Sequence, residues 1–190
     1  MKIEVFKNDD EKVLWEGKPN KRAFIKERIF SPLLPFVLLW LLIDLGFIIG
    51  MIAGNSEGFP LFMIVPFFII HLFPVWYYIG SVIFANFAWK NTEYMVTDKA
   101  VYSLRGVFTT HNVRKTFQEI TNISFKQGII DKLCNVGDIF IATTGSSSTS
   151  VSFIDIDNYL DVYKLITKTG KDVFSDTMYP NDLRPDKNDK

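Results

Sequence analysis

Residues 32–89 read PLLPFVLLWLLIDLGFIIGMIAGNSEGFPLFMIVPFFIIHLFPVWYYIGSVIFANFAW, and this stretch decides the fold. It contains none of the 21 Lys and Arg residues of the 190-residue chain. Two apolar runs, 32–53 and 59–89, are separated only by the polar break GNSEG at 54–58. As a helix the first run rises about 33 Å, which is enough to cross a hydrocarbon core of about 30 Å. The sequence therefore predicts a helical hairpin that spans a membrane.

The alternative is a buried pair of helices in a soluble protein, since helices that are apolar on all sides occur in both settings. The polar remainder of the chain is too small to enclose two such helices, so the membrane is favoured. The second run would reach about 46 Å as one helix, and it must tilt or emerge into water at one end. Pro66 and Pro74 lie in its interior and are expected to kink it, because each removes a backbone hydrogen bond.

Positive charge flanks the stretch on both sides and is missing from the connecting loop. The positive-inside rule then places both termini in the cytoplasm, as in a multi-pass protein of a bacterial inner membrane. The flanking side chains are also candidates for contact with anionic lipid headgroups, although setting the topology is an equally good explanation for them. These candidates are Lys18, Lys21, Arg22, Lys26, Arg28 and Lys90.

Asp44 and His71 are ionisable residues inside the two apolar runs. Counted from the loop ends at Ala53 and Phe59, they lie about 14 and 18 Å deep, so both are close to the midplane. An intramembrane acid usually faces the protein interior and is paired or neutral. We expect Asp44 and His71 to face each other, either to hold the hairpin together or to form part of a proton or ion pathway.

The remainder predicts an N-terminal strand near Val13 and Trp15, a short helix at 21–30, and a β-rich domain at 90–170. Strand-like runs rich in Val and Tyr surround a tight turn at 97–99, and helical spacing begins after the N-cap candidate Asp157 and ends before Gly170. A turn is expected at 145–148. Residues 1–31 would form a separate cytoplasmic segment, and 171–190 would be disordered. The expected core is Val96, Val101, Leu104, Ile123, Ile139, Ile141, Phe153, Leu160 and Tyr163.

Composition excludes several kinds of function. The formal net charge is zero, which argues against a nucleic-acid partner. Cys134 is the only cysteine, so no internal disulfide forms. With two histidines and no phosphate-binding glycine loop or CxxC, the sequence predicts no catalytic site, no metal site and no cofactor. The seven basic and four acidic residues of 90–132 favour general attraction to an anionic surface over a headgroup pocket.

Four segments carry a family resemblance: EKVLWEGKPN (11–20), EYMVTDKAVYSLRG (93–106), QEITNISFKQGIIDKLCNVGDIFIATTG (118–145) and SFIDIDNYLDVYKLI (152–166). With them the chain resembles the bacterial PH-like membrane proteins, which carry a transmembrane hairpin ahead of a pleckstrin-homology-like domain. The resemblance implies an α+β domain in which an antiparallel bent sheet, or partly open barrel, of seven strands is capped by a C-terminal helix. It implies no settled activity and no ligand residues.

The function expected from the sequence is that of a non-enzymatic membrane protein. Its cytoplasmic PH-like domain would serve as an interaction or assembly module, with a protein partner or a second copy of the chain. The rival hypothesis is a component of a transport or envelope-stress system that works through Asp44 and His71.

Overall fold

The structure is a computed structural model that describes residues 3–54, 61–144 and 151–178. The chain forms two compact units: Met1–Phe24 with Phe87–Lys190, which we call the β-domain, and Ile25–Asn86, which we call the helical unit. The boundaries expected at 31 and 89 differ from this division. The N-terminal residues up to Phe24 belong to the β-domain, in which β1 pairs with a strand that follows the helical unit in sequence.

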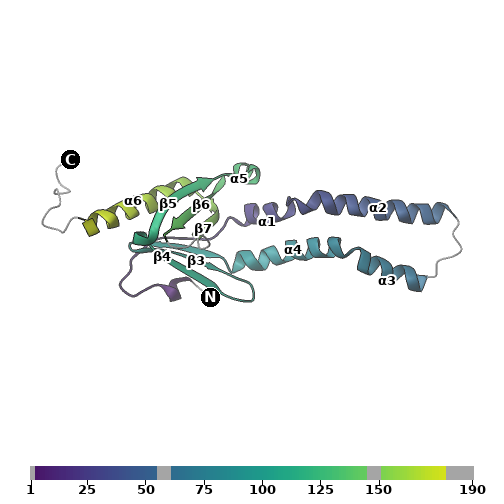
Figure 1. Ribbon diagram of the computed structural model, residues 1–190, viewed down its shortest axis with the longest axis horizontal. Coiled ribbons are helices and arrows are strands. Elements are labelled where there is room, and N and C mark those ends of the chain that lie inside the picture. Colours follow the sequence, from purple (N-terminus) through teal and green to yellow (C-terminus); the bar gives the residue numbers. More distant parts are fainter. Residues whose placement is uncertain (1–2, 55–60, 145–150, 179–190) are drawn as a thin grey trace. The chain divides into compact units, whose positions relative to one another are not determined.

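The helical unit follows α1 (Lys21–Ile29) and consists mainly of α2 (Leu33–Ala53), α3 (Leu61–His71) and α4 (Phe73–Lys90) (Figure 1). The second apolar run is therefore two helices, bent by 51°. The bend falls just before Pro74, which has no N–H to bond to the Ile70 carbonyl and whose ring crowds that carbonyl. Pro66 lies inside α3 without ending it. The expected kink is thus found at Pro74.

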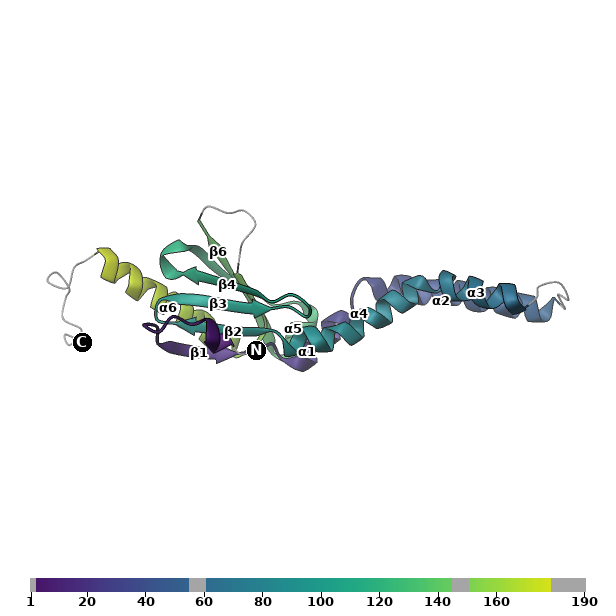
Figure 2. The same cartoon turned by 90° about the horizontal axis from the view of Figure 1, so that it is seen from below.

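Helix α2 is long and apolar enough to cross a bilayer, and the bent pair 62–71 and 73–90 meets the same test when taken as one span. Its large apolar side chains are exposed on all sides, as Leu42 (64%) and Ile52 (75%) show. Helix α2 lies alongside α3, with the rings of Phe47 and Phe68 6.2 Å apart (Figure 2). The linking segment 55–60 lies outside the described residues.

The β-domain contains two antiparallel sheets, and this confirms an α+β fold of the PH-like kind. The first sheet has the order β1-β2-β3-β4 and the second the order β5-β6-β7. The strands are β1 (Val13–Gly17), β2 (Glu93–Thr97), β3 (Ala100–Arg105), β4 (His111–Thr116), β5 (Ile120–Lys126), β6 (Val136–Thr143) and β7 (Val151–Asp157).

Strand β1 precedes the helical unit in sequence, yet it pairs with β2, which follows it. Trp15 of β1 stacks on Phe153 with ring centroids 5.8 Å apart, so this side chain completes the domain core. The turn between β2 and β3 is at Asp98 and Lys99, as predicted. The turn after β3 depends on Gly106, because its φ of 137° and the nearby Thr109 carbonyl leave no room for a Cβ atom.

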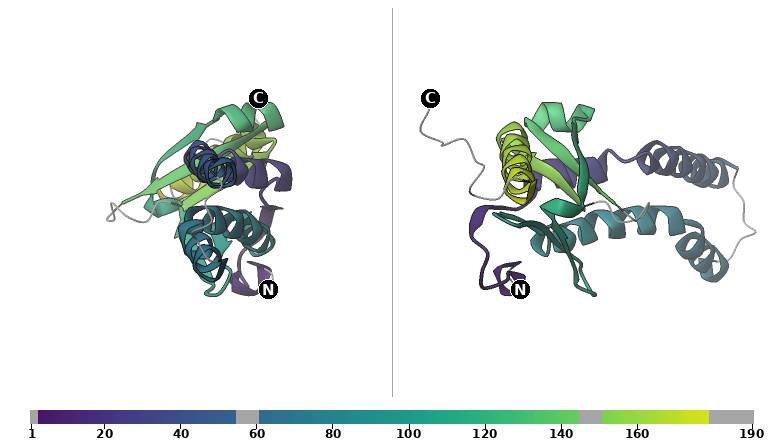
Figure 3. Two further views of the ribbon diagram at one scale, coloured as in Figure 1. Left: turned by 90° about the vertical axis from the view of Figure 1, so that its right-hand side faces the viewer. Right: turned by 60° about the vertical axis from the view of Figure 1, so that its left-hand side comes forward.

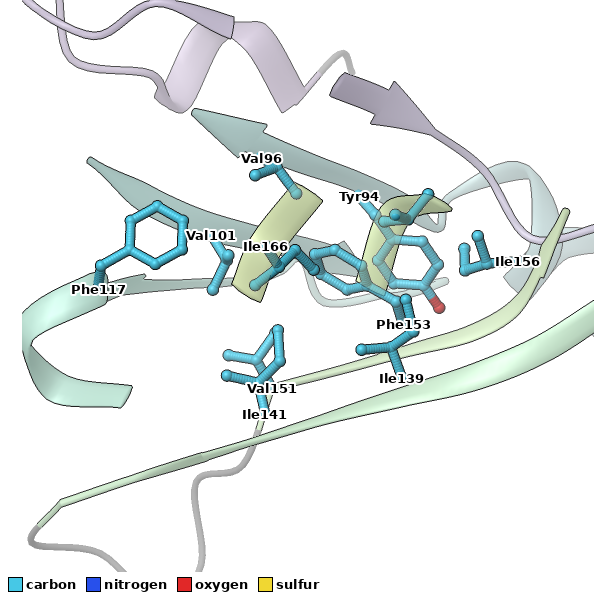
Figure 4. Close-up of a cluster of buried hydrophobic side chains, with 11 residues drawn as sticks. Tyr94, Val96, Val101, Phe117, Ile139, Ile141, Val151, Phe153, Ile156 and Ile166 are labelled. Carbon is cyan, nitrogen blue, oxygen red and sulfur yellow. The ribbon is translucent and has the colours of Figure 1, made fainter. Parts of the chain in front are cut away.

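Helix α6 (Tyr159–Met178) packs on both sheets, and buried side chains of sheets and helix form one core (Figures 3 and 4). Of the expected core, six residues are buried and two, Ile123 and Tyr163, are partly buried against it. Leu160 was predicted wrongly, since it is 43% exposed. The helix turns Val162 and Ile166 inward instead, one turn apart on the same face.

The expected end of α6 at Gly170 is also wrong, because the helix continues to Met178. Gly170 lies against the Phe117 ring, which a Cβ atom would meet at 3.4 Å, and Val173 packs on the core. Tertiary packing therefore carries the helix past a residue that commonly ends one. Disorder was predicted for 171–190, and 171–178 are helical. Residues 179–190, like the turn expected at 145–148, lie outside the described residues.

A short helix, α5 (Ile129–Cys134), forms between β5 and β6. The Asp131 carboxylate accepts a hydrogen bond from the Gly128 N–H at 2.7 Å at its start. Asn135 ends it in the left-handed conformation, at φ 56°. Two 3₁₀ turns, η1 (Ile3–Phe6) and η2 (Phe117–Glu119), complete the described elements.

Candidate functional site

The helical unit brings Asp44 and His71 together. The Nε2 atom of His71 lies 3.0 Å from Oδ1 of Asp44, and Asp44 is 6% exposed. The His71 ring stacks on Phe67, with centroids 5.0 Å apart and planes 14° apart. Trp40 also contacts His71. Its Nε1 donates a 3.1 Å hydrogen bond to the His71 carbonyl, and the centroids of the two rings are 4.9 Å apart.

This arrangement leaves one carboxylate oxygen unused. Among the described residues, Oδ2 of Asp44 is buried and has no hydrogen-bond partner. The geometry suits a hydrogen bond from the imidazole Nε2–H to the carboxylate, whether the imidazole is neutral or charged. The pair joins α2 to α3, and the free oxygen is able to accept a further proton or hydrogen bond.

The six basic candidates for lipid contact have different surroundings. The Nζ atom of Lys18 lies 2.9 Å from Oε1 of Glu93, so its charge is already paired. Lys21 lies over the Trp89 ring at 5.2 Å. Arg22, Lys26 and Arg28 on α1 and Lys90 at the end of α4 are exposed. Lys18 is therefore the least suited of the six to bind a headgroup.

Trp89 and Glu93 hold the N-terminal segment onto the β-domain. The Trp89 Nε1 donates a 2.7 Å hydrogen bond to the Pro19 carbonyl, and Glu93 Oε2 accepts one of 2.7 Å from the Ile3 N–H. Burial alone would raise the pKa of Glu93, but Lys18 and the Ile3 amide outweigh it and hold the pKa below its usual value. These bonds join segments that lie on either side of the helical unit in sequence.

A polar network surrounds Glu11, and sequence reasoning did not predict it. This residue is 4% exposed and its carboxylate meets Arg114 Nη2 at 2.6 Å. Thr97 Oγ1 donates to it at 2.7 Å, and the Tyr102 hydroxyl lies 3.0 Å away. Burial alone would raise the pKa of Glu11, but these hydrogen bonds lower it below its usual value. Asn8 is a local partner, since its Nδ2 donates to Glu11 Oε1 at 3.0 Å. Thr97, Tyr102 and Arg114 lie 86 to 103 residues away, so the local sequence does not mark the network.

A groove of about 540 Å³ lies between β5 and α6. Its apolar lining includes Phe117, Ile123 and Phe174. Strand β5 has β6 as its neighbour on one side only, so in the described domain its other edge is free. Lys171 lies on the helix side of the groove, and the adjoining hollow adds Lys164, Lys168 and the single acid Asp172, so its charge is positive on balance. The groove thus combines an apolar floor, a strand edge and a positively charged rim.

Three comparisons with known proteins were made, and one of them identifies a family. A search of curated proteins and a search of solved structures gave no match. The family model described as "Bacterial PH domain" matches residues 36–169, which is more than half of the chain. The match begins within α2 and ends within α6, and it includes strands β2 to β7 but not β1. The chain belongs to the bacterial PH domain family.

Proposed function

We propose that this protein is an integral membrane protein whose cytoplasmic β-domain serves as an interaction module for assembly at the membrane. The observation that carries the membrane part is the exposure of large apolar side chains along α2, α3 and α4. Phe62 (71%), Ile70 (74%) and Ile52 (75%) are examples. In water such a surface drives aggregation, whereas in hydrocarbon it is the expected exterior of a span.

The proposed topology has two spans, α2 and the bent pair α3 and α4, with both termini in the cytoplasm. It follows from the positive charges before α2 and at Lys90, and from their absence between 32 and 89. The exposed side chains of Arg22, Lys26 and Arg28 would then lie near anionic headgroups. Each such contact contributes about 1 kcal/mol of attraction.

The topology is tested by cysteine labelling in intact cells, in a Cys134→Ser background. Ser56→Cys should react with an impermeant maleimide, and Ser175→Cys should react only after the membrane is opened. Labelling of Ser175→Cys in intact cells would overturn the orientation. Failure of both to react in intact cells, with both reacting after lysis, would overturn the spans.

The interaction role is supported by family membership, since PH domains are generally interaction modules rather than catalysts. The surface best suited to it is the groove between β5 and α6. Its occupant in this proposal is an extended segment of a partner protein that pairs with the β5 edge. Acidic side chains of that segment would face Lys164, Lys168 and Lys171, which is the charge complementarity that selects it.

Photocrosslinking in native membranes tests this surface. A benzophenone amino acid at Asn122, on β5, should capture the partner, while the same probe at Asn112 on β4 should not. Replacing the three lysines by Glu should abolish capture without lowering the melting temperature. Equal capture from both positions, or capture that survives the charge reversal, would show that the groove does not select the partner.

A second candidate function is favoured by one observation, the buried and unpartnered Oδ2 of Asp44. A proton or ion pathway through the spans would use this oxygen together with His71. Replacing the spans by inert apolar helices separates the two functions. Activity retained by the exchanged protein supports the interaction module, and activity lost despite normal assembly supports the pathway.

A further inference from the structure

Helix α5 presents two apolar side chains to solvent. Ile129 is 81% exposed and Leu133 is 76% exposed, and their spacing of four residues puts them on one face. Single exposed apolar residues are ordinary on protein surfaces. Two adjacent ones on the tip of a short connection are less so, because each costs solubility without adding to the core.

The charges around this tip are positive. Lys126 and Lys132 are exposed, whereas Asp131 is 1% exposed and its carboxylate binds the Gly128 N–H inside the turn. The only acid between 125 and 135 is thus withdrawn from the surface. An apolar tip with a basic rim has the composition of a segment that lies in the interface of an anionic bilayer.

The tip also has a fixed shape. Gln127 Nε2 donates a 2.6 Å hydrogen bond to the Val136 carbonyl, which closes the base of the loop. The Asn135 N–H bonds to the Asp131 carbonyl at the end of the helix. Ile129 and Leu133 are therefore held outward before any contact is made, and little ordering entropy remains to be lost on binding.

Contacts within the β-domain place α5 at the end where the chain leaves for the helical unit. Asn20, next to α1, donates from its backbone N–H to the Asp155 carbonyl and from its side chain to Asp157. Asp157 is the pairing partner of Val136, which lies two residues after α5. The base of α5 and the exit at Asn20 therefore share one end of the second sheet.

The turn between β3 and β4 reaches the same end. Glu93, three residues after Lys90 at the end of α4, pairs with Leu104 near the end of β3. Phe108 in the following turn is 89% exposed. Two apolar projections, one on each sheet, thus occur at the end of the β-domain from which the chain enters the apolar helices.

We propose that the α5 tip, with Ile129 and Leu133, inserts into the headgroup region of an anionic bilayer, and that Phe108 makes a second contact there. This inference rests on the membrane location proposed above. The apolar side chains enter the interface while Lys126 and Lys132 remain among the anionic headgroups. The contact would fix the orientation of the β-domain on the membrane.

Lipid-borne quenchers test the proposal on the full chain in nanodiscs. Single cysteines carrying an environment-sensitive fluorophore replace Ile129, Leu133 or Phe108 in a Cys134→Ser background. Phe174→Cys is the matched control, because Phe174 is an exposed apolar residue (62%) near the C-terminal end of α6. Leu42→Cys on α2 reports insertion of the span itself. Phosphatidylglycerol-rich bilayers contain a doxyl lipid with its spin label near the headgroup, and a parallel set with the label deep in the acyl chain reads out position 42.

We expect quenching at 129, 133 and 108, with little at 174, and a loss of quenching at 129 when Lys126 and Lys132 are replaced by Glu. Quenching at 42 but not at 129 and 133 would overturn the tip contact and leave the proposed membrane location intact. No quenching at 42 would overturn both. Protection of 129 from aqueous iodide without lipid quenching would mean that a protein or a second copy covers the tip, which also overturns the proposal.

Discussion

The carboxylate of Glu11 lies 2.6 Å from the guanidinium of Arg114, although 103 residues, including the whole helical unit, separate the two in sequence. The pair holds the segment before β1 against β3 and β4, with the Tyr102 hydroxyl bonded to both partners. The N-terminal segment is thus a part of the β-domain that polar contacts, as well as strand pairing, keep in place.

Substitution of Glu11 by Gln should lower the free energy of unfolding of the β-domain by about 2 kcal/mol. The loss is below that for a fully buried pair because Arg114 is one-third exposed and recovers hydration. Chemical denaturation followed by tryptophan fluorescence measures it. Glu16→Gln, an exposed position on β1, is the control and should change stability little. Equal effects of the two substitutions would contradict a specific role for the network.

Acid should weaken the same contacts. The pKa values of Glu11 and Glu93 lie below their ordinary value in the folded protein, so each carboxylate stabilises the fold fully above that value, near 4.5. That contribution is lost as the pH falls through the lower, folded pKa. The stability difference between the wild type and Glu11→Gln should therefore be constant from pH 8 to about pH 5 and shrink below pH 4. A difference that grows on acidification would show that the sign of the shift is wrong.

Gly170→Ala tests whether α6 continues through position 170 or ends there. Inside a helix, Ala is favoured over Gly by about 0.5–1 kcal/mol, and the added methyl group would meet Phe117 at an ordinary contact distance of 3.4 Å. We expect a small gain in melting temperature. If Gly170 ended the helix in a left-handed conformation, the same substitution would lower it. Gly106→Ala is the opposite control, since its φ of 137° predicts a clear loss.

Ile166 and Leu160 lie on different faces of α6, so truncating each to Ala should lower the stability of the domain by different amounts. Ile166→Ala removes a fully buried side chain and should cost about 2–5 kcal/mol of stability. Leu160→Ala removes one that is 43% exposed and should cost less than about 1 kcal/mol. Equilibrium unfolding of both variants measures the difference. A larger loss at Leu160 would restore the core assignment made from the sequence.

The Asp44–His71 contact should be measurable as an energetic coupling. In a double-mutant cycle of Asp44→Leu and His71→Leu, we expect a coupling of about 1 kcal/mol, as for other hydrogen bonds inside membrane proteins. Unfolding of the full chain in bicelles provides the readout. Asp44→Asn should be milder than Asp44→Leu, because an amide still accepts a hydrogen bond from His71. A coupling near zero would mean that the two side chains act independently.

Local patterns predicted much of this molecule because they depend on neighbouring residues. The run 32–53 has the bounds of α2 to within one residue, and the alternation around Thr97–Lys99 gave the β2–β3 hairpin. Proline chemistry placed the bend at Pro74. The depth argument paired Asp44 with His71 because two antiparallel helices of equal rise bring equal depths together.

The features that sequence reasoning missed depend on contacts between distant residues. The carboxylate of Glu11 is held mainly by Arg114, Tyr102 and Thr97, which are all remote in sequence. Helix α6 passes Gly170 because Phe117 and the core support the next turns. The pairing of β1 is a further example, since its partner β2 follows the helical unit in sequence.

The β-domain is made of segments that precede and follow the helices in sequence, so it cannot fold until the helices have been synthesised. Val13 of β1 pairs with Thr97 of β2, so the strand must wait while more than 80 residues, including the whole hairpin, are made. At about 5–20 residues per second this delay is on the order of 4–16 s. In the proposed topology, a hairpin that inserted only one of its spans would leave β1 and β2 on opposite sides of the bilayer, and the domain could not close. Folding of the β-domain would then be a check on membrane insertion, and a chain with only one span inserted would keep an unpaired strand edge that marks it for degradation.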